Sequence, residues 1–161
     1  MIRDLHNNDA QPVLEIYRQG LDTGEASFET EPPDWPAWQA KYHPFCRLVW
    51  DDSGAVRGWA ALAPVSARTC YRGVAEVSIY VARDYFGRGI GNELMAALVE
   101  ASERQGIWTL YSSVFPENLA TVKLHLRHGF RKVGTRERIA QRDGRWRDTL
   151  VLERRSDKVG I

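Results

Sequence analysis

The segment Gly87-Arg88-Gly89-Ile90-Gly91-Asn92 lies between a β-prone stretch, Ala75 to Val81, and the clearest helical pattern in the chain, Arg88 to Gln105. Glycines let backbone N–H groups turn toward one point, and the start of a helix adds partial positive charge. This combination predicts a cradle for a pyrophosphate, although a plain strand-to-helix turn would use the same residues. No Gly-Lys-Ser/Thr follows, and the glycines do not complete GxGxxG, so the Walker and dinucleotide loops are excluded.

The stretch before this loop alternates as expected of a strand with two different faces. One face is apolar and the other polar, with Ala75, Val77, Ile79 and Val81 on the first and Glu76, Ser78 and Tyr80 on the second. After the loop, apolar residues recur at helical spacing, at Ile90, Leu94, Ala97, Leu98 and Ala101. Gly106 stands where a helix would stop. We therefore predict a strand, a phosphate loop and a long helix in succession.

The rest of the chain indicates further strands and helices. Asp9 is placed to cap a helix that ends near Gly20, and three prolines between Thr30 and Pro36 predict an ordered loop. The other expected elements are a helix at Trp35 to Tyr42, a hairpin of Arg47 to Trp50 with Val56 to Leu62, a strand at Trp108 to Phe115, a helix at Glu117 to Arg127, and a last hairpin that follows Gly129-Phe130, turns at Gly144 and ends at Leu152. This order favours an α+β fold, with a mixed and mostly antiparallel central sheet flanked by helices, over a doubly wound parallel sheet.

Length and composition narrow the possible functions. The 161 residues suit one domain with a sizeable core, 43% are hydrophobic, and 22 Lys and Arg balance 21 Asp and Glu. This balance disfavours a disordered chain or a nucleic-acid partner. No stretch approaches the roughly 20 apolar residues of a membrane span, the polar start lacks an apolar signal region, and Cys46 and Cys70 form no CxxC pair. We expect a single cytoplasmic domain, residues 1–161, with no membrane partner.

The glycine loop and a second motif resemble the GCN5-related N-acetyltransferase (GNAT) superfamily. Its acetyl-CoA loop has the pattern Gln/Arg-x-x-Gly-x-Gly/Ala, and Phe86 to Gly91 has this register, with Phe86 in place of the polar side chain. Asn118, His125 and Gly129-Phe130 are similar to the pattern Asn-x6-Tyr-x3-Gly-Phe. The resemblance implies acetyl-CoA as co-substrate, bound by Ile79, Tyr80, Val81, Gly87, Arg88, Gly89, Ile90, Gly91, Asn92 and Asn118. His125 replaces the tyrosine that often protonates the leaving thiolate, so the source of that proton stays open.

Three further segments resemble the phosphinothricin and methionine sulfoximine/sulfone N-acetyltransferases within this superfamily. They are Ser27 to Pro33, Arg68 to Arg72 with the strand that follows, and Asp143 to Asp148, which has a Gly-x-Trp-x-Asp pattern. The resemblance implies acetyl transfer to the α-amine of a small amino acid such as phosphinothricin, methionine sulfoximine or methionine sulfone. It also implies a homodimer. Six tryptophans, more than one small core readily encloses, point to the same association.

Glu76 is the candidate catalytic base. Acetyl transfer to an amine requires a group that removes the ammonium proton and donors that stabilise an oxyanion. On the polar face of an otherwise apolar strand, partial desolvation would raise the pKa of this glutamate. A structural ion pair with Arg68 or Arg72 is the alternative, and Asp84 is a rival base better placed to cap the turn. Backbone N–H groups near Tyr80-Val81 would act on the oxyanion if the strand splays from its neighbour.

The acceptor-binding candidates lie in two segments, and they are Phe28, Thr30, Arg68, Thr69, Cys70, Tyr71 and Arg72. Arginine suits this role because a guanidinium makes bidentate bonds to a carboxylate or phosphinate. Solvated hairpin charges are the alternative for the two arginines. Phe28 is placed to wall an amino-acid pocket, and the segment around it to close over the substrate.

Two other functions are compatible with these motifs. One is acetylation of another amine, such as a polyamine, an antibiotic or a protein N-terminus, although two nearby arginines would repel a polyamine. The other is a non-catalytic sensor that binds acyl-CoA and releases no thiol. His125 and His128 share a helical face without a third ligand, so no metal site is expected.

Overall fold

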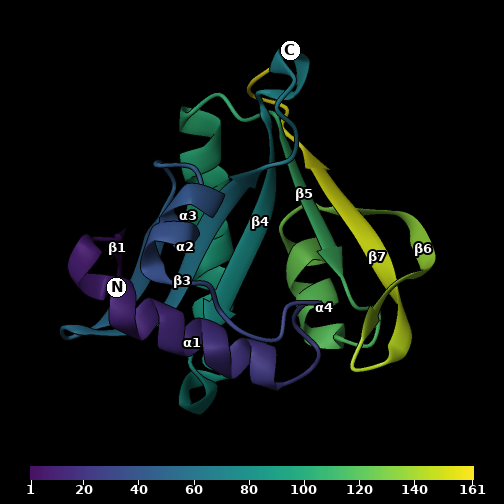
Figure 1. The fold of residues 1–161 in the computed structure, drawn as a ribbon. Helices are drawn as coiled ribbons and strands as arrows, with labels where there is room; N and C mark the ends of the chain where they lie inside the picture. The colour runs from purple at the N-terminus through teal and green to yellow at the C-terminus, as the bar shows by residue number, and fades with distance from the viewer.

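Seven strands form one mixed sheet in the computed structural model, which describes residues 1–161 (Figure 1). The strands are β1 (Ile2–Asp4), β2 (Leu48–Asp52), β3 (Ala55–Pro64), β4 (Val74–Val81), β5 (Thr109–Val114), β6 (Arg131–Arg142) and β7 (Arg145–Arg155), and the helices are α1 (Ala10–Asp22), α2 (Trp35–Lys41), α3 (Ile90–Arg104) and α4 (Leu119–Arg127). The strand order is β1-β2-β3-β4-β5-β7-β6, and only β4 and β5 are parallel. This arrangement confirms the predicted α+β fold with a mostly antiparallel sheet. None of the helices combines the length and apolar character needed to cross a membrane.

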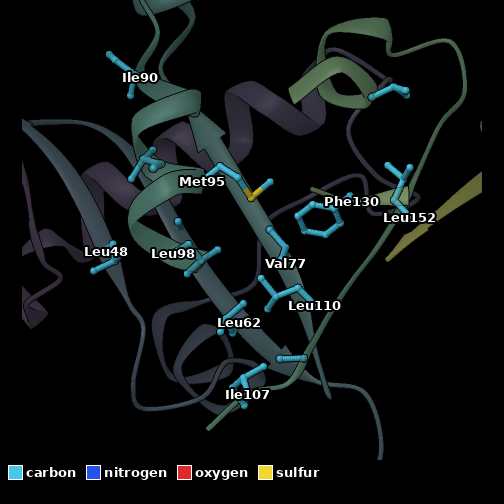
Figure 2. Close-up of a cluster of buried hydrophobic side chains, with 14 of the residues drawn as sticks. Leu48, Leu62, Val77, Ile90, Met95, Leu98, Ile107, Leu110, Phe130 and Leu152 are labelled. Atoms are coloured by element: carbon cyan, nitrogen blue, oxygen red, sulfur yellow. The ribbon is translucent and has the colours of Figure 1, made fainter. Parts of the chain in front are cut away.

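Two hydrophobic cores cover the two faces of the sheet. On one face, Met95 and Leu98 of α3 pack over strand residues such as Leu62, Val77 and Leu110 (Figure 2). On the other face, buried residues of α1 and α2 enclose a cluster of large aromatic rings, Tyr17, Trp38, Tyr42 and Trp59. The central strands are therefore held between two helical layers, and the side chains of β3 alternate between the two cores, with Ala60 and Leu62 in one and Trp59 and Ala61 in the other.

The predicted succession of strand, loop and long helix is confirmed. Ala75 and Val77 of β4 lie in the α3-side core, as their alternation with polar residues requires. Helix α3 begins after Gly89, which has a φ of +82°, and Gly106, with a φ of +76°, follows its end. These positive φ values favour glycine, because a side chain would be strained there.

Three local expectations are corrected by the structure. Asp9 precedes α1, but its carboxylate accepts from the His6 N–H and pairs with Arg3 at 2.8 Å instead of capping that helix. The proline-rich loop ends earlier than expected, since Pro36 lies in the first turn of α2, where a missing N–H costs nothing. Five of the six tryptophans are buried or half-buried, and only Trp146 is exposed, at 58%. The tryptophan count therefore gives no reason for a dimer.

The sheet opens between its two parallel strands. β4 and β5 pair only over Val74–Glu76 and Thr109–Tyr111, although β4 continues to Val81 and β5 to Val114. Figure 1 shows the two strands diverging beyond this short ladder, with α4 beside the gap. The splay that the oxyanion donors require is thus present.

Candidate active site

A cavity of about 970 Å³ fills the opening between β4 and β5. Its floor is the last part of β4, from Glu76 to Val81, and one end is formed by the glycine loop and the start of α4. The other end is formed by the last turn of α1, the segment after it, and Lys41 at the end of α2. The cavity therefore has a glycine-loop half and an α1–α2 half, which meet over β4.

Glu76 lies on the cavity floor at the base of the opening. It is the last residue of β4 in register with β5, opposite Tyr111, and its side chain is half-buried. Burial raises the pKa of Glu76, nearby Lys41 lowers it, and Glu29 raises it, with a net increase over the ordinary value. The structure pairs this carboxylate with neither Arg68 nor Arg72, so it is available as a proton acceptor.

The main chain of β4 offers donors beside this carboxylate. The N–H of Ala82 donates to the carbonyl of Arg57 across the β3 side, at 2.8 Å. Because N–H groups alternate between the two edges of a strand, those of Ile79 and Val81 point to the opposite edge, where β5 has diverged. Two unpaired backbone donors therefore line the gap. This refines the predicted position near Tyr80-Val81.

The glycine loop fits an extended phosphate ligand. Gly87 and Gly89 have φ values of +76° and +82°, and a Cβ on either would meet no atom within 4 Å, so open space surrounds them. A Cβ on Gly91 would be 3.6 Å from Leu124 Cδ2 and 3.9 Å from Val81 Cγ2, which are ordinary contacts. The protein itself does not require glycine at position 91. An external ligand that approaches the unpaired N–H groups of the first turn of α3 would require it.

The other predicted cofactor residues divide into two groups. Ile90, Asn92 and Asn118 line the cavity, and Asn118 caps α4 by accepting from the Thr121 N–H at 3.3 Å. Arg88 is outside the lining, and its guanidinium carbon lies 4.4 Å from the centroid of the Tyr85 ring.

The predicted acceptor residues are mostly outside the cavity. Phe28 lines it and packs edge-on against Phe115, with ring centroids 5.0 Å apart. Thr30 does not line it, and neither does any residue from Arg68 to Arg72, which precede the closed end of β4. The rival base Asp84 is exposed and is also outside this cavity. The substrate role of Thr30 and of Arg68 to Arg72 therefore remains a prediction from resemblance alone.

Sequence reasoning missed two side chains at the α1–α2 half of the cavity. Tyr17 and Lys41 line it, and both contact Glu29 from the segment between their helices. The Tyr17 hydroxyl donates to Glu29 at 2.5 Å, and the Lys41 ammonium donates to both Glu29 and the Tyr17 hydroxyl at 3.1 Å. Tyr17 follows core spacing and Lys41 ends a helix, so neither carries a sequence signal of a site.

The sequence profile of the Acetyltransferase (GNAT) family matches residues 10–130. The chain belongs to the acetyltransferase (GNAT) family. It is 30% identical over 158 residues to an L-methionine sulfoximine/L-methionine sulfone acetyltransferase from Pseudomonas paraeruginosa, covering 94% of this chain and 92% of the relative. It is 31% identical over 154 residues to a phosphinothricin N-acetyltransferase from Streptomyces coelicolor, covering 91% and 90%. Its fold matches a GNAT superfamily phosphinothricin acetyltransferase from Sinorhizobium meliloti in complex with AcCoA, with a TM-score of 0.89 and 28% identity, covering 99% of this chain and 90% of that chain.

Family membership identifies the reaction that this protein catalyses. The protein is an acetyl-CoA-dependent N-acetyltransferase, and acetyl-CoA is its co-substrate. The predicted family, enzyme class and co-substrate are confirmed. The open glycine loop and the unpaired β4 donors are the features of this chain that suit a pyrophosphate and a thioester carbonyl, respectively.

Proposed function

We propose that this GNAT enzyme acetylates the α-amine of a small amino acid such as phosphinothricin, methionine sulfoximine or methionine sulfone. The observation that carries the proposal is the position of Glu76, a half-buried carboxylate at the junction of the two cavity halves. Two relatives at 30% and 31% identity, a methionine sulfoximine/sulfone acetyltransferase and a phosphinothricin N-acetyltransferase, support this acceptor class. Phe28 also lines the cavity, as expected of a residue that walls an amino-acid pocket.

The chain's own residues divide the work of transfer. Acetyl-CoA supplies an activated acetyl group. Glu76 accepts the ammonium proton of the acceptor, directly or through one water, so that the amine has a free electron pair for attack. The N–H groups of Ile79 and Val81 donate to the thioester oxygen as the new C–N bond forms and negative charge develops on this oxygen. The C–S bond then breaks, and coenzyme A leaves as its thiolate. Both functions come from one strand, β4, so the extended backbone between Glu76 and Ile79 fixes their separation.

We assign acetyl-CoA to the glycine-loop half of the cavity, called the cofactor half below. This half is formed by the end of β4, the glycine loop and α4. We propose that Ile79, Tyr80, Val81, Gly87, Gly89, Ile90, Gly91, Asn92 and Asn118 contact acetyl-CoA, and that Arg88 contributes its backbone. The whole of residues 1–161 is proposed as one acetyltransferase domain. A homodimer is proposed from the family resemblance. A cytoplasmic location is proposed because Cys46 and Cys70 form no CxxC pair and suit a reducing compartment.

Thiol release from acetyl-CoA tests the function directly. The panel contains phosphinothricin, methionine sulfoximine, methionine sulfone, a polyamine and a peptide with a free N-terminus. Release with the three amino acids at a kcat/KM at least tenfold above the others supports the proposal. Release with the peptide or polyamine instead would assign another acceptor, and acetyl-CoA binding without release from any amine would indicate a sensor.

A further inference from the structure

Two hydrogen bonds hold Lys41 at the wall of the α1–α2 half of the cavity, which we call the acceptor half. Its ammonium is 3.1 Å from the Tyr17 hydroxyl and 3.1 Å from Glu29 Oε1. An ammonium has three N–H donors, so one remains after these two contacts. Lys41 lines the cavity and its side chain is 37% exposed, so the third donor has access to a ligand.

Lys41 differs from the other charged residues of the cavity lining in its position. Two of its lining glutamates, Glu25 and Glu117, form ion pairs with Arg147. The other lining cations, Lys123 and Arg127, belong to α4, at the glycine-loop half. Among the lining residues from α1, α2, the segment between them and β4, Lys41 is the only lysine or arginine.

An amino-acid acceptor needs a cation in this half. Its carboxylate must enter a half that already contains Glu76 and adjoins Glu29, and each of these carboxylates repels it. Burial lowers the pKa of Lys41, but Tyr42 and Glu29 outweigh this effect and leave the pKa above its ordinary value. The side chain therefore carries its positive charge at neutral pH.

We propose that Lys41 binds the α-carboxylate of the acceptor, and that Glu29 competes with this carboxylate for the Lys41 ammonium. Tyr17 is a positioning residue, since its hydroxyl accepts from Lys41 and donates to Glu29. The inference rests on the proposed amino-acid substrate and names the group that recognises it. Selectivity for amino acids over cationic amines follows, because an amine without a carboxylate gains nothing from Lys41 and is repelled by it.

The test compares methionine sulfone with its α-carboxamide, which differs only at the carboxylate. Lys41→Gln should raise the KM for methionine sulfone about 10- to 100-fold, the range expected for one charged hydrogen bond, and change the KM for the amide by less than threefold. Glu29→Gln removes the competing charge, while its single amide oxygen accepts from Lys41 and its NH2 group donates to the Tyr17 hydroxyl. It should lower the KM for the acid and leave that for the amide unchanged.

Two further variants make the result decisive. Lys123→Gln removes a lining lysine at the other half of the cavity and should not change the acid-to-amide ratio. Arg72→Gln tests the segment that the sequence predicted for this role, and discrimination lost there but kept in Lys41→Gln would overturn the inference. Equal KM changes for acid and amide in Lys41→Gln would overturn it as well. If the wild-type enzyme releases thiol with none of phosphinothricin, methionine sulfoximine and methionine sulfone, the proposed function fails and the inference with it. Calorimetric titration with acetyl-CoA should give the same affinity for Lys41→Gln as for wild type, which checks that the variant is folded.

Discussion

The Nδ1 atom of His125 lies 2.6 Å from the carbonyl oxygen of Thr121, one turn earlier in α4. A carbonyl only accepts, so Nδ1 carries the proton and Nε2 has the lone pair. Nε2 is buried without a hydrogen-bond partner. Burial lowers the pKa of His125, the Thr121 carbonyl opposes this, and His128 adds to the lowering, with a net decrease. A neutral ring in this tautomer has no proton on Nε2 to give to a departing thiolate.

We predict that His125 is not the general acid of the reaction. His125→Asn can retain a donor to Thr121 while removing Nε2, so kcat should fall far less than the roughly 100-fold or more that a general acid contributes. The pH profile of kcat should keep its shape. Nitrogen chemical shifts of the imidazole should show the neutral Nδ1–H tautomer at pH 7. An imidazolium signal at that pH, together with a 100-fold loss in His125→Asn, would restore the acid role.

A substitution at Gly91 tests the proposed pyrophosphate site. A Cβ there makes only ordinary contacts, and Gly91 has no positive φ, so the backbone at this position accepts a side chain. The unfolding temperature of Gly91→Val checks that its two γ-methyl groups leave the fold intact. Its branched side chain would occupy the space through which a pyrophosphate reaches the start of α3, so the acetyl-CoA Kd should rise at least tenfold. Gly134→Val is the matched control, because Gly134 also has free space and no positive φ but lies in β6. Equal acetyl-CoA affinity in both variants would count against the cradle.

Glu76→Gln should lower kcat at neutral pH by roughly 100- to 10,000-fold, the usual contribution of a positioned base. Activity should recover partly at higher pH, where more of the acceptor amine is already deprotonated. Initial rates with saturating acceptor across pH 6 to 10 measure both effects. A wild-type kcat and profile in this variant would mean that the base is another group.

The same variant should be more stable than the wild type at neutral pH. Burial, partly offset by Lys41, raises the pKa of Glu76, so the folded state disfavours its ionised form. This penalty is absent below the unfolded glutamate pKa of about 4.3 and is complete above the folded pKa. Glu76→Gln cannot ionise, so its Tm should exceed that of wild type at pH 7 and converge with it near pH 4. A Tm difference independent of pH would contradict the assigned cause.

The sequence predicted the fold, and it supplied the cofactor residues that we propose, because both sets of signals are local. The alternation in β4, the glycines before α3 and the helical spacing after them each depend on residues close together in the chain. The divergence of β4 from β5 has no such signal, since it depends on where a long-range ladder ends. The catalytic use that we propose for the β4 backbone therefore depends on the register that stops at Glu76 and Tyr111, which the sequence does not contain as a local pattern.

The acceptor half was harder to predict for the same reason. Arg68 and Arg72 precede β4, and only the parallel pairing shows that this end of the strand is closed. In the sequence, Lys41 has the position of an ordinary basic residue in the last turn of a helix, where it complements the helix dipole. Its contact with Tyr17 joins two helices across 24 positions of sequence, which no spacing rule anticipates.

Arg147 should stabilise the position of the segment after α1 at the edge of the cavity. Its side chain is 12% exposed, lies 3.9 Å from the Phe115 ring centroid, and pairs with Glu25 at 3.1 Å and Glu117 at 3.3 Å. It thereby ties the segment after α1 to the segment between β5 and α4.

Arg147→Met retains apolar contact with the Phe115 ring but leaves Glu25 and Glu117 to repel each other. We expect the acceptor KM to rise about three- to tenfold, with faster amide exchange around Glu25, as for the loss of about 1 kcal/mol from partly exposed ion pairs. Arg145→Met, an exposed neighbour on β7 with no ion pair, should change neither quantity. Unchanged exchange around Glu25 in Arg147→Met would show that the cover is held by other contacts.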